Sequence, residues 1–600
     1  MYETDVLVVG SGPAGSSAAL ALSTYGVRNM VVTKHRWLAD TPRAHYINQR
    51  TMEIMRDLGV DAEIIAKAAS LRVMGNVVFC TSLSGVELGR LPYGANSAKR
   101  RSDYALASPC EQCDLPQHLL EPILLSNAAS RGSHVRFDTE YLAHEQDADG
   151  VTVTLKDRLA GSHHSIRCKY LLGADGGNSK IASDLNLPME GQMGKSGSIS
   201  IILHADLTRF VAHRPGYLWW VLQPGSGIGG IGMGLLRMVR PWTEWQIVWG
   251  YDIDEPAPMV TEADAIRIAH QFFGDSSVDV EIKSISLWTV NEMSAARYSD
   301  RRVLCLGDAV HRHPPSNGLG SNTSIQDAYN LAWKLKLALS GAASPGMLAS
   351  YDEERVPVGR QVIRRANKSV RDFGHMFDAL GISGSDEAET MNRNIAAVRD
   401  DSPLGATRRE HLRRAIALKS YEFATLGVEL NVRYESSSAI IHQGMHEAVP
   451  SSFDPELHYQ ASVRPGGRLP HVWLNRRGQE ISSLDLAGNG CFTLLTGIGG
   501  DVWIHAAQQM AAEFGVPISC VLIGPGRDVE DLYGDWSELR EGLASDGFLV
   551  RPDAYIAWRG NVVEASNGAL RHVFLALLGR LRDEKGEACM VARHVQDAMS

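Results

Sequence analysis

The chain has no long hydrophobic run, no basic tract and no acidic tail. A membrane-spanning helix needs about 20 mainly apolar residues, and no stretch of the sequence predicts one. The opening residues, MYETDVLVVG, lack the basic region that begins a secretory signal and predict a strand instead. The formal net charge of -10 disfavours nucleic acid as a partner. We therefore expect a cytoplasmic protein with no nucleic-acid or membrane partner.

Cysteine is scarce and scattered, with 8 residues in 600. Only Cys110 and Cys113 form a C-x-x-C pair, and no second pair or nearby histidine cluster stands at zinc spacing. Reduced thiols of a cytosolic enzyme are the favoured interpretation, and a redox or zinc role for this pair is the alternative.

The N-terminal segment predicts a βαβ unit with a glycine-rich turn. A buried strand, DVLVVG, leads into the helix GPAGSSAALALSTYG and then into a second strand, NMVVTK. Gly10, Gly12 and Gly15 lie at the turn in the pattern G-x-G-x-x-G, which is typical of dinucleotide sites. The first glycine makes a tight turn, the second lets the backbone approach a pyrophosphate, and the third lets the helix pack on the strand.

The residues after the second strand depart from the usual dinucleotide pattern. An acid normally binds the ribose hydroxyls at this position. This chain has Thr33, Lys34 and His35 there instead. Thr33 and Lys34 are therefore candidate cofactor contacts, with His35 as an alternative.

Two later strands also end in a glycine and an acid. YLLGADGG carries Asp175 at its tip, and RRVLCLGD carries Asp308.

Between these two strands, the aromatic and strand-rich stretch 197–289 predicts an inserted antiparallel sheet. The polar stretch 87–103 predicts a surface loop. Beyond residue 444, the strand and helix pattern predicts a small α/β domain of thioredoxin type, which lacks the cysteine pair that dithiol exchange requires.

The segment GDAVHRHPPSNGLGSN allows two interpretations. Asp308, His311 and His313 are metal-ligand types, but a metal needs further ligands that the nearby sequence does not supply. The alternative is a helix start whose free N–H groups and dipole stabilise negative charge. The helix TSIQDAYNLAWKL follows directly, so the second interpretation is favoured.

These motifs, in this order and spacing, resemble those of the class A FAD-dependent aromatic hydroxylases. The likeness extends over GSGPAG, RAHYINQRTMEIMRDLG, LPQHLLEPIL, LLGADGGNS, VLCLGDAVHRHPPSNGLGSNTSIQDAYNLAWKL, SYDEERVPVGRQV and LVRPDAYIAWRG. The last segment is typical of the phenol hydroxylase branch, which carries a thioredoxin-like C-terminal domain. Within that branch the chain is most similar to the bacterial 2,4-dichlorophenol 6-monooxygenases, nearly from end to end.

The resemblance implies an α/β fold in which a Rossmann-like FAD-binding domain carries an inserted antiparallel substrate sheet, a helical segment and a thioredoxin-like C-terminal domain. The expected domains are the first part of the FAD-binding domain (1–185), the substrate sheet (186–290), the second part of the FAD-binding domain with its helices (291–430) and the C-terminal domain (431–600).

The resemblance also implies bound FAD and transiently bound NADPH, for which the sequence shows no second Rossmann domain. Asp308 would bind the ribityl hydroxyls, and the N-terminal glycines the pyrophosphate. Ala182 stands where the motif around Asp175 usually ends in an arginine. The residues expected at the cofactor are Gly10, Gly12, Gly15, Thr33, Lys34, Arg43, Gln117, Asp175, Asp308, Gly318, Gly320 and Asn322, of which the last three begin the helix that faces the flavin.

The implied reaction is the ortho-hydroxylation of a phenol to a catechol. NADPH would reduce FAD, and reduced FAD with O2 would form a C4a-hydroperoxide that attacks the ring. Pro315, with Pro314, would fix the backbone beside the flavin C4a. His45 stands where phenol hydroxylases have an aspartate near the substrate, and it is the candidate base because histidine titrates near neutrality. A histidine that only packs on the flavin face is the alternative.

The inserted sheet is expected to supply the substrate pocket. Its candidate residues, each of which could instead be an ordinary core residue, are Trp220, Met233, Trp288, Asn291 and Met293. Asn291 and Glu292 stand where phenol hydroxylases have Gln-Arg, so that site offers no arginine for a carboxylate-bearing substrate. Apolar and aromatic liners favour a neutral or halogenated phenol, and the resemblance implies a chlorophenol.

Three other functions stay open from the sequence. One is a flavin hydroxylase of a larger polycyclic substrate of polyketide type. Another is a flavin- or NAD-linked dehydrogenase that inserts no oxygen. The third is a binding module in which FAD is structural and the C-terminal domain recruits partners. The family resemblance also predicts a homodimer or homotetramer.

Overall fold

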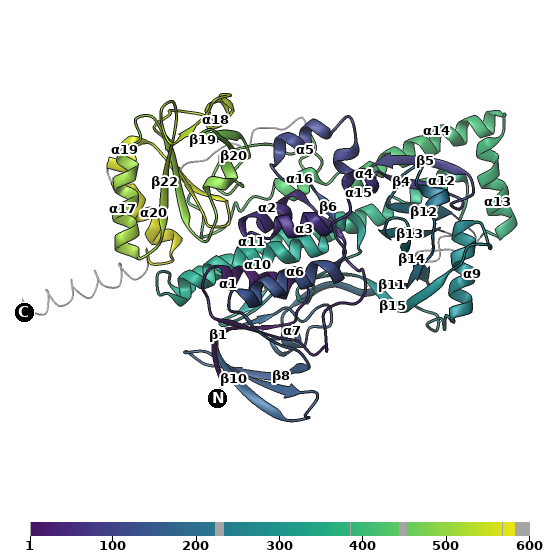
Figure 1. Ribbon diagram of the computed structural model, residues 1–600, viewed down its shortest axis with the longest axis horizontal. Helices are drawn as coiled ribbons and strands as arrows, with labels where there is room; N and C mark the ends of the chain where they lie inside the picture. Colours follow the sequence, from purple (N-terminus) through teal and green to yellow (C-terminus); the bar gives the residue numbers. More distant parts are fainter. Residues whose placement is uncertain (1, 223–232, 384–385, 443–452, 567, 582–600) are drawn as a thin grey trace, which may run out of the picture.

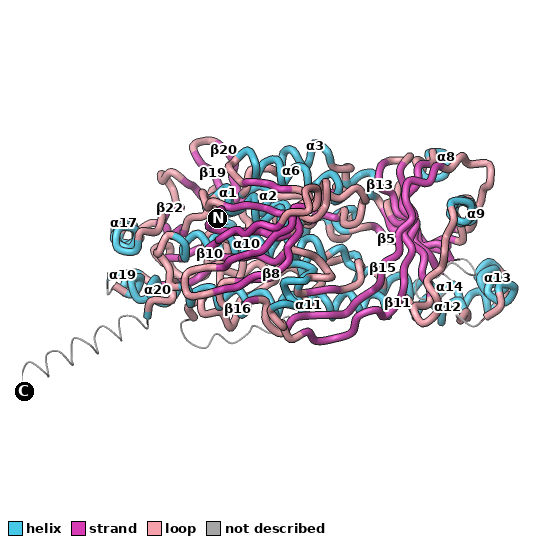
Figure 2. The backbone as a smooth tube through the Cα atoms, turned by 90° about the horizontal axis from the view of Figure 1, so that it is seen from below, coloured by secondary structure: helices cyan, strands magenta, loops and turns pink. Residues whose placement is uncertain are grey.

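Three large sheets organise the part of the chain that the computed structural model describes (Figure 1). The C-terminal sheet lies at one end of the molecule, the inserted sheet at the other end, and the nucleotide-type sheet between them (Figures 1 and 2). Helices α10 (Gly320–Leu339) and α11 (Ala349–Arg371) run lengthwise between the two ends. The described residues are 2–222, 233–383, 386–442, 453–566 and 568–581.

The nucleotide-type sheet has the strand order β16-β17-β10-β1-β2-β7, and β17, β10, β1, β2 and β7 pair in parallel. The register brings β1, β2, β10 and β17 to an end at the same level. The turns that carry Gly10, Asp175 and Asp308 therefore meet at one edge, where doubly wound sheets bind their ligands. The strand bounds are β1 Tyr2–Val9, β2 Asn29–Val32, β7 His134–Arg136, β10 His163–Gly173, β16 Ser299–Asp300 and β17 Val303–Cys305.

Helices α1 (Pro13–Thr24), α6 (Gln117–Ser130) and α10 cover one face of this sheet (Figure 1). Helix α1 consists mainly of small residues and buries most of its length, so its neighbours approach it closely. Among the described residues, no helix is both long enough and apolar enough to cross a membrane.

The inserted sheet has the strand order β18-β15-β11-β14-β13-β12-β4-β5. The stretch 87–92, expected in a loop, forms β5 and was predicted wrongly. It is an edge strand that pairs only with β4, and an edge tolerates the glycine, proline and charges that made it look like a turn. The strands are β4 Asn76–Cys80, β5 Glu87–Pro92, β11 Met189–His204, β12 Leu218–Leu222, β13 Met233–Arg240, β14 Glu244–Tyr251, β15 Glu281–Ala295 and β18 His311–Arg312.

The C-terminal sheet has the order β20-β19-β23-β22-β21-β24-β25. Strands β21 and β22 are parallel and flank α17, and β24 and β25 form an antiparallel hairpin before α20. This is the thioredoxin-like arrangement that the sequence predicts. The elements are β19 Trp473–Arg476, β20 Gln479–Ser482, β21 Phe492–Gly497, α17 Val502–Phe514, β22 Ile518–Ile523, β23 Val529–Glu530, β24 Gly547–Val550, β25 Ile556–Gly560 and α20 Ala569–Leu577.

Candidate active site

The three glycines of the N-terminal turn have different surroundings. A Cβ on Gly10 would lie 2.1 Å from the Ala174 carbonyl oxygen, and a Cβ on Gly15 would lie 2.0 Å from the Gly10 carbonyl oxygen. Neither position therefore has room for a side chain, because the protein backbone occupies that space. A Cβ on Gly12 would meet only Glu121 Oε1, at 4.0 Å. The space beside Gly12 is open, as the approach of a pyrophosphate requires.

The start of α1 can receive that pyrophosphate. Its N-cap residue is Gly12, no side chain caps the helix, and its first turn contains no acidic residue. Free N–H groups at a helix start, together with the helix dipole, bind phosphate. The residues at this edge therefore fit the diphosphate of FAD.

The loop that carries Asp308 is fixed on one side and open on the other. Gly307 has a φ of 66°, and its N–H donates to Asp327 Oδ2 at 3.2 Å. A Cβ on Gly307 would lie 3.0 Å from that of Ala14 in α1. The Asp308 side chain is exposed, and no hydrogen bond to its carboxylate is recorded within the described residues. Its carboxylate is available to the ribityl hydroxyls.

The Asp175 carboxylate stabilises the backbone that follows it at the same edge. Its carboxylate accepts hydrogen bonds from Ser179 Oγ at 2.5 Å and from the Lys180 N–H at 2.8 Å. These bonds hold the start of the short helix α7 (Lys180–Asp184). A cofactor contact through Asp175 stays a prediction.

Gln117 is the first residue of α6, and Arg43 lies in the loop that follows β2. Gln117 Nε2 donates to Glu121 Oε1 at 2.6 Å, and its backbone N–H donates to the Ala44 carbonyl at 2.6 Å. Arg43 is exposed, and Thr33 is buried at the end of β2. Lys34 is exposed beside it. The predicted residues thus gather around one edge, and their individual contacts to FAD stay predictions.

Asn322 differs from the expectation because its side chain is already bound. Its Nδ2 donates to the Tyr46 and Gly318 carbonyls at 2.9 and 2.7 Å, and its Oδ1 accepts from the Asn48 N–H at 3.0 Å. Asn322 therefore fixes the start of α10 against β3 (Tyr46–Ile47). The groups left to face a flavin there are backbone N–H groups, including that of Gly320.

The two prolines before α10 differ in exposure. Pro314 is buried, and its carbonyl lies 2.6 Å from His313 Nδ1, whereas Pro315 is exposed. Gly318 has a φ of 64°, and a Cβ there would lie 2.8 Å from the Tyr46 ring. The loop is thus packed at both ends with Pro315 at its surface, and the catalytic role of Pro315 stays a prediction.

His311 is a buried structural residue. Its side chain is 0% exposed, and its Nε2 lies 2.7 Å from Asp327 Oδ2. The same aspartate binds Arg355 Nε at 2.7 Å. The described ranges contain no group of three or more residues of metal-binding type.

His45 forms a dyad with Asp114, which sequence reasoning missed. His45 Nδ1 lies 2.5 Å from Asp114 Oδ2, and the carboxylate is 0% exposed. Antiparallel pairing of β3 with β6 (Cys113–Asp114) places Asp114 opposite Tyr46, next to His45. If Nδ1 is protonated and donates a hydrogen bond to the carboxylate, Nε2 keeps its lone pair and can accept a proton. The only signal for Asp114 in the sequence is an acid between apolar residues.

Arg237 is a second missed residue of this region. It is 3% exposed, and its Nη1 donates to the Pro42 and Arg43 carbonyls at 2.6 and 3.0 Å. Its Nε and Nη2 are buried and have no partner among the described residues. Burial lowers the pKa of Arg237 to about 10. Burial first, and the Arg237 charge second, also lower the pKa of His45 below its usual value, and Asp114 opposes them.

Three tyrosines form an aromatic wall beside His45. The ring of Tyr217 lies 5.9 Å from that of His45, Tyr93 lies 4.6 Å from Tyr217, and Tyr46 lies 5.2 Å from Tyr93. All three side chains are buried, with exposures of 2% for Tyr217, 4% for Tyr93 and 3% for Tyr46. The candidate base therefore borders an apolar, aromatic surface, as a phenol site requires.

The predicted substrate residues do not form one wall. Residues that pair across neighbouring strands share a face of the sheet. Followed from β12 through β13, β14 and β11 to β15, the pairing places Trp220, Met233 and Trp288 on the face that carries Arg237. Side chains alternate along a strand, so Asn291 and Met293 point away from the face of Trp288. Asn291 Oδ1 instead accepts from the Gly194 N–H at 2.8 Å, beside a register shift in β11.

Comparisons with known proteins identify the family of the chain. Residues 3–366 match the family model "FAD binding domain", and residues 462–580 match "Aromatic-ring hydroxylase, C-terminal". The 2,4-dichlorophenol 6-monooxygenase of Delftia acidovorans is 52% identical over 93% of this chain and 95% of its own. The enzyme of the same name from Cupriavidus pinatubonensis is 50% identical over 98% of both.

The solved structures lead to the same family. The flavin-dependent monooxygenase PieE, in complex with FAD and substrate, superposes with a TM-score of 0.92 at 41% identity, and the match covers 96% of this chain and 99% of that one. A ternary complex of aklavinone-11 hydroxylase with FAD and aklavinone has a TM-score of 0.79 at 28% identity, covering 97% of this chain and 100% of that one. The predicted fold and cofactor are confirmed, and the chain belongs to the FAD-binding family of aromatic-ring hydroxylases.

Proposed function

We propose that this chain is an FAD- and NAD(P)H-dependent monooxygenase that hydroxylates a phenol ortho to its hydroxyl group and yields a catechol. Chlorophenols are the proposed substrate class. The names of the relatives at 50–52% identity, and of a phenol 2-monooxygenase at 46% identity, support this proposal. The observation that carries it is the His45–Asp114 dyad beside an aromatic wall.

The dyad supplies a base for the substrate hydroxyl. Bound FAD, reduced by NAD(P)H that binds transiently, supplies the activation of O2. His45 Nε2 would accept the phenol proton, which makes the ring more nucleophilic because phenolate donates more electron density than phenol. Asp114 holds the imidazole in the required tautomer and stabilises its protonated form, as a buried acid does in other dyads.

Arg237 supports the same step through its charge. Burial first, and then this buried cation, lower the pKa of His45, which favours the unprotonated base. The same charge favours a phenolate over a phenol beside it. Arg237 therefore supplies a cation that the positions of Asn291 and Glu292 do not.

The test is a substrate series with product identification. The purified holoenzyme is given NADPH or NADH with phenol, chlorophenols, hydroxybenzoates and a fused-ring phenol. We expect chlorophenols to stimulate oxidation and to yield the corresponding catechols in a ratio near one to the NAD(P)H consumed. Oxygen uptake without hydroxylated product would support a dehydrogenase or oxidase, and turnover of fused-ring phenols alone would support a hydroxylase of polyketide type.

We further propose that the enzyme acts in the cytoplasm as a homodimer or homotetramer, without nucleic-acid or membrane partners. Light scattering on the purified holoenzyme measures the assembly. A monomer at micromolar concentration would contradict it.

A further inference from the structure

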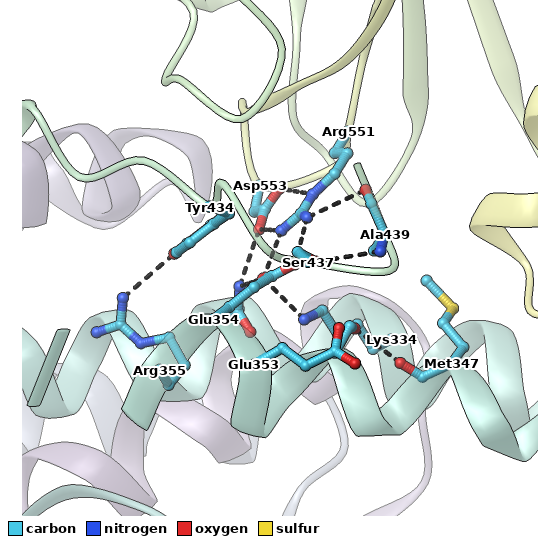
Figure 3. Close-up of polar contacts among 12 residues, drawn as sticks. Lys334, Met347, Glu353, Glu354, Arg355, Tyr434, Ser437, Ala439, Arg551 and Asp553 are labelled. Carbon is cyan, nitrogen blue, oxygen red and sulfur yellow. Dashed lines mark hydrogen bonds and ion pairs between the residues drawn. The ribbon is translucent and has the colours of Figure 1, made fainter. Parts of the chain in front are cut away.

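The C-terminal domain contacts the FAD-binding domain through a buried cluster of charges (Figure 3). Arg551, just after β24, pairs with Glu354 of α11 at 2.6 Å and with Asp553 at 2.5 Å. Glu354 also accepts from Lys334 of α10 at 2.8 Å and from Asn330 at 2.6 Å. The charged side chains of this cluster are at most 2% exposed. The domain is therefore joined to α10 and α11 by interactions shielded from water.

A neighbouring set of contacts leads from this domain towards the cofactor loop. The rings of Tyr434 and Tyr555 stack at 4.3 Å. Arg355 Nη1 donates to the Tyr434 hydroxyl at 3.2 Å (Figure 3). Arg355 Nε donates to Asp327 Oδ1 at 2.7 Å. The other oxygen of Asp327 accepts from the Gly307 N–H at 3.2 Å.

Both flavin-facing segments are held by this set of contacts. Gly307 directly precedes Asp308, the residue with the free carboxylate. Arg355 Nη2 also donates to the Thr323 carbonyl at 3.4 Å, in the first turns of α10. A shift of Arg355 would therefore move the Asp308 loop and the start of α10 together.

The charges in this set depend on one another because they are buried. Burial favours the neutral acid at Asp327, yet Arg355 and His311 hold its pKa below the usual range. Without the Tyr434 hydroxyl, one donor of Arg355 would lose its acceptor in a site without water access, which is costly for a charged group. The C-terminal domain has no C-x-x-C pair for redox chemistry. Its contacts instead reach the residues that hold the loops of the cofactor site.

We propose that the C-terminal domain positions the flavin site through the contacts Tyr555–Tyr434–Arg355–Asp327–Gly307. Tyr434 and Arg355 are positioning residues in this proposal, since they act on the Asp308 loop through Asp327 and do not contact the reacting atoms. The expected consequence is that a change at Tyr434 weakens FAD binding and separates NAD(P)H oxidation from hydroxylation, although the protein stays folded.

The test uses Tyr434→Phe in the full chain, which keeps the stacked ring and removes only the hydroxyl. FAD is titrated into the apoprotein, and its Kd is followed by flavin fluorescence. Hydrogen peroxide per NAD(P)H is measured in the holoenzyme, and the melting temperature of the apoprotein is recorded. Arg355→Lys is the second variant, because lysine keeps the charge near Asp327 and cannot make the other contacts together.

The matched control is Arg56→Gln. Arg56 of α2 (Gln49–Asp57) forms an ion pair with Asp485 of the C-terminal domain at 2.9 Å, outside the proposed contacts. We expect Tyr434→Phe to raise the FAD Kd about tenfold, a size seen for residues that couple distant sites, and Arg56→Gln to leave it unchanged. A wild-type Kd and peroxide yield in both Tyr434→Phe and Arg355→Lys would overturn the proposal. Because FAD binding is measured without substrate, this result does not depend on which phenol the enzyme accepts.

Discussion

Asp114 lies 2.5 Å from Nδ1 of His45, on a strand that pairs with the residues directly after that histidine. The contact joins an acid with no solvent exposure to an imidazole that borders the aromatic wall. It resembles a base held by an acid more than a histidine that only packs against its surroundings.

Replacing Asp114 by Asn is expected to lower hydroxylation about 100-fold, within the range for general-base catalysis. The Asn amide can donate to Nδ1 and move the imidazole proton to Nε2, where it blocks the base. Asp114 raises the pKa of His45, so its loss also shifts the acid limb of any residual activity to lower pH. The measurement is single-turnover hydroxylation against pH, with FAD content as the control. An unchanged rate and profile would contradict the dyad.

Replacing Arg237 by Gln is expected to move the pH profile in the opposite direction. The Arg237 charge lowers the pKa of His45, so its removal raises that pKa and shifts the acid limb to higher pH. Activity near neutrality should fall, and it should recover in part at alkaline pH because the base is unprotonated there. Comparison with the Asp114→Asn profile provides the control, since only opposite shifts agree with the two charges.

The sequence predicted those parts of the fold and site that depend on local backbone chemistry. Gly10 and Gly15 are required by close backbone approaches, and Asp308 follows a buried strand whose pattern is unmistakable. Strand β5 was missed because edge strands tolerate residues that also form turns. The three sheets themselves follow from hydrophobic runs separated by glycine.

The sequence could not predict partners that only the tertiary fold brings together. Asp114 is 69 positions from His45, and Arg237 is 194 positions from Arg43. Neither belongs to a motif, so only strand pairing reveals them. Asn291 was placed at the pocket from its position in the chain, but the face on which a strand residue points depends on register.

The glycines of the N-terminal turn should separate folding from cofactor binding. A methyl group on Gly12 meets open space in the protein, so Gly12→Ala should keep the apoprotein melting temperature and weaken FAD binding about tenfold, or about 1.4 kcal/mol. Gly10 has a φ of 108° and no room for a Cβ. Gly10→Ala should therefore lower the free energy of unfolding by on the order of 3 kcal/mol. Calorimetry of the apoproteins and FAD titration test both statements, and equal effects in the two variants would contradict them.

His471 of the C-terminal domain should make the stability depend on pH. Burial first, and then the nearby Arg468 charge, lower its pKa to about 4 in the folded chain. Its contribution to stability is therefore fully present above pH about 6.5, the usual histidine value, and is lost as pH falls from there towards about 4. The difference amounts to at most about 3 kcal/mol. In His471→Asn, melting temperature should fall less steeply between pH 7 and pH 5, and an unchanged slope would contradict the prediction.

Adjacent tryptophans of β12 offer a test of the substrate-facing side of the inserted sheet. Trp220 shares its face with Arg237, and its ring lies 4.5 Å from that of Phe373, whereas Trp219 points to the opposite face. Both are buried, with exposures of 6% and 0%, so Trp220→Phe and Trp219→Phe should both lower the melting temperature. Only Trp220→Phe should raise KM for a small phenol, by about tenfold, and improve turnover of a bulkier one, because it enlarges the space beside the substrate. If Trp219→Phe changed this selectivity equally, the assignment of the pocket to the Arg237 face would be wrong.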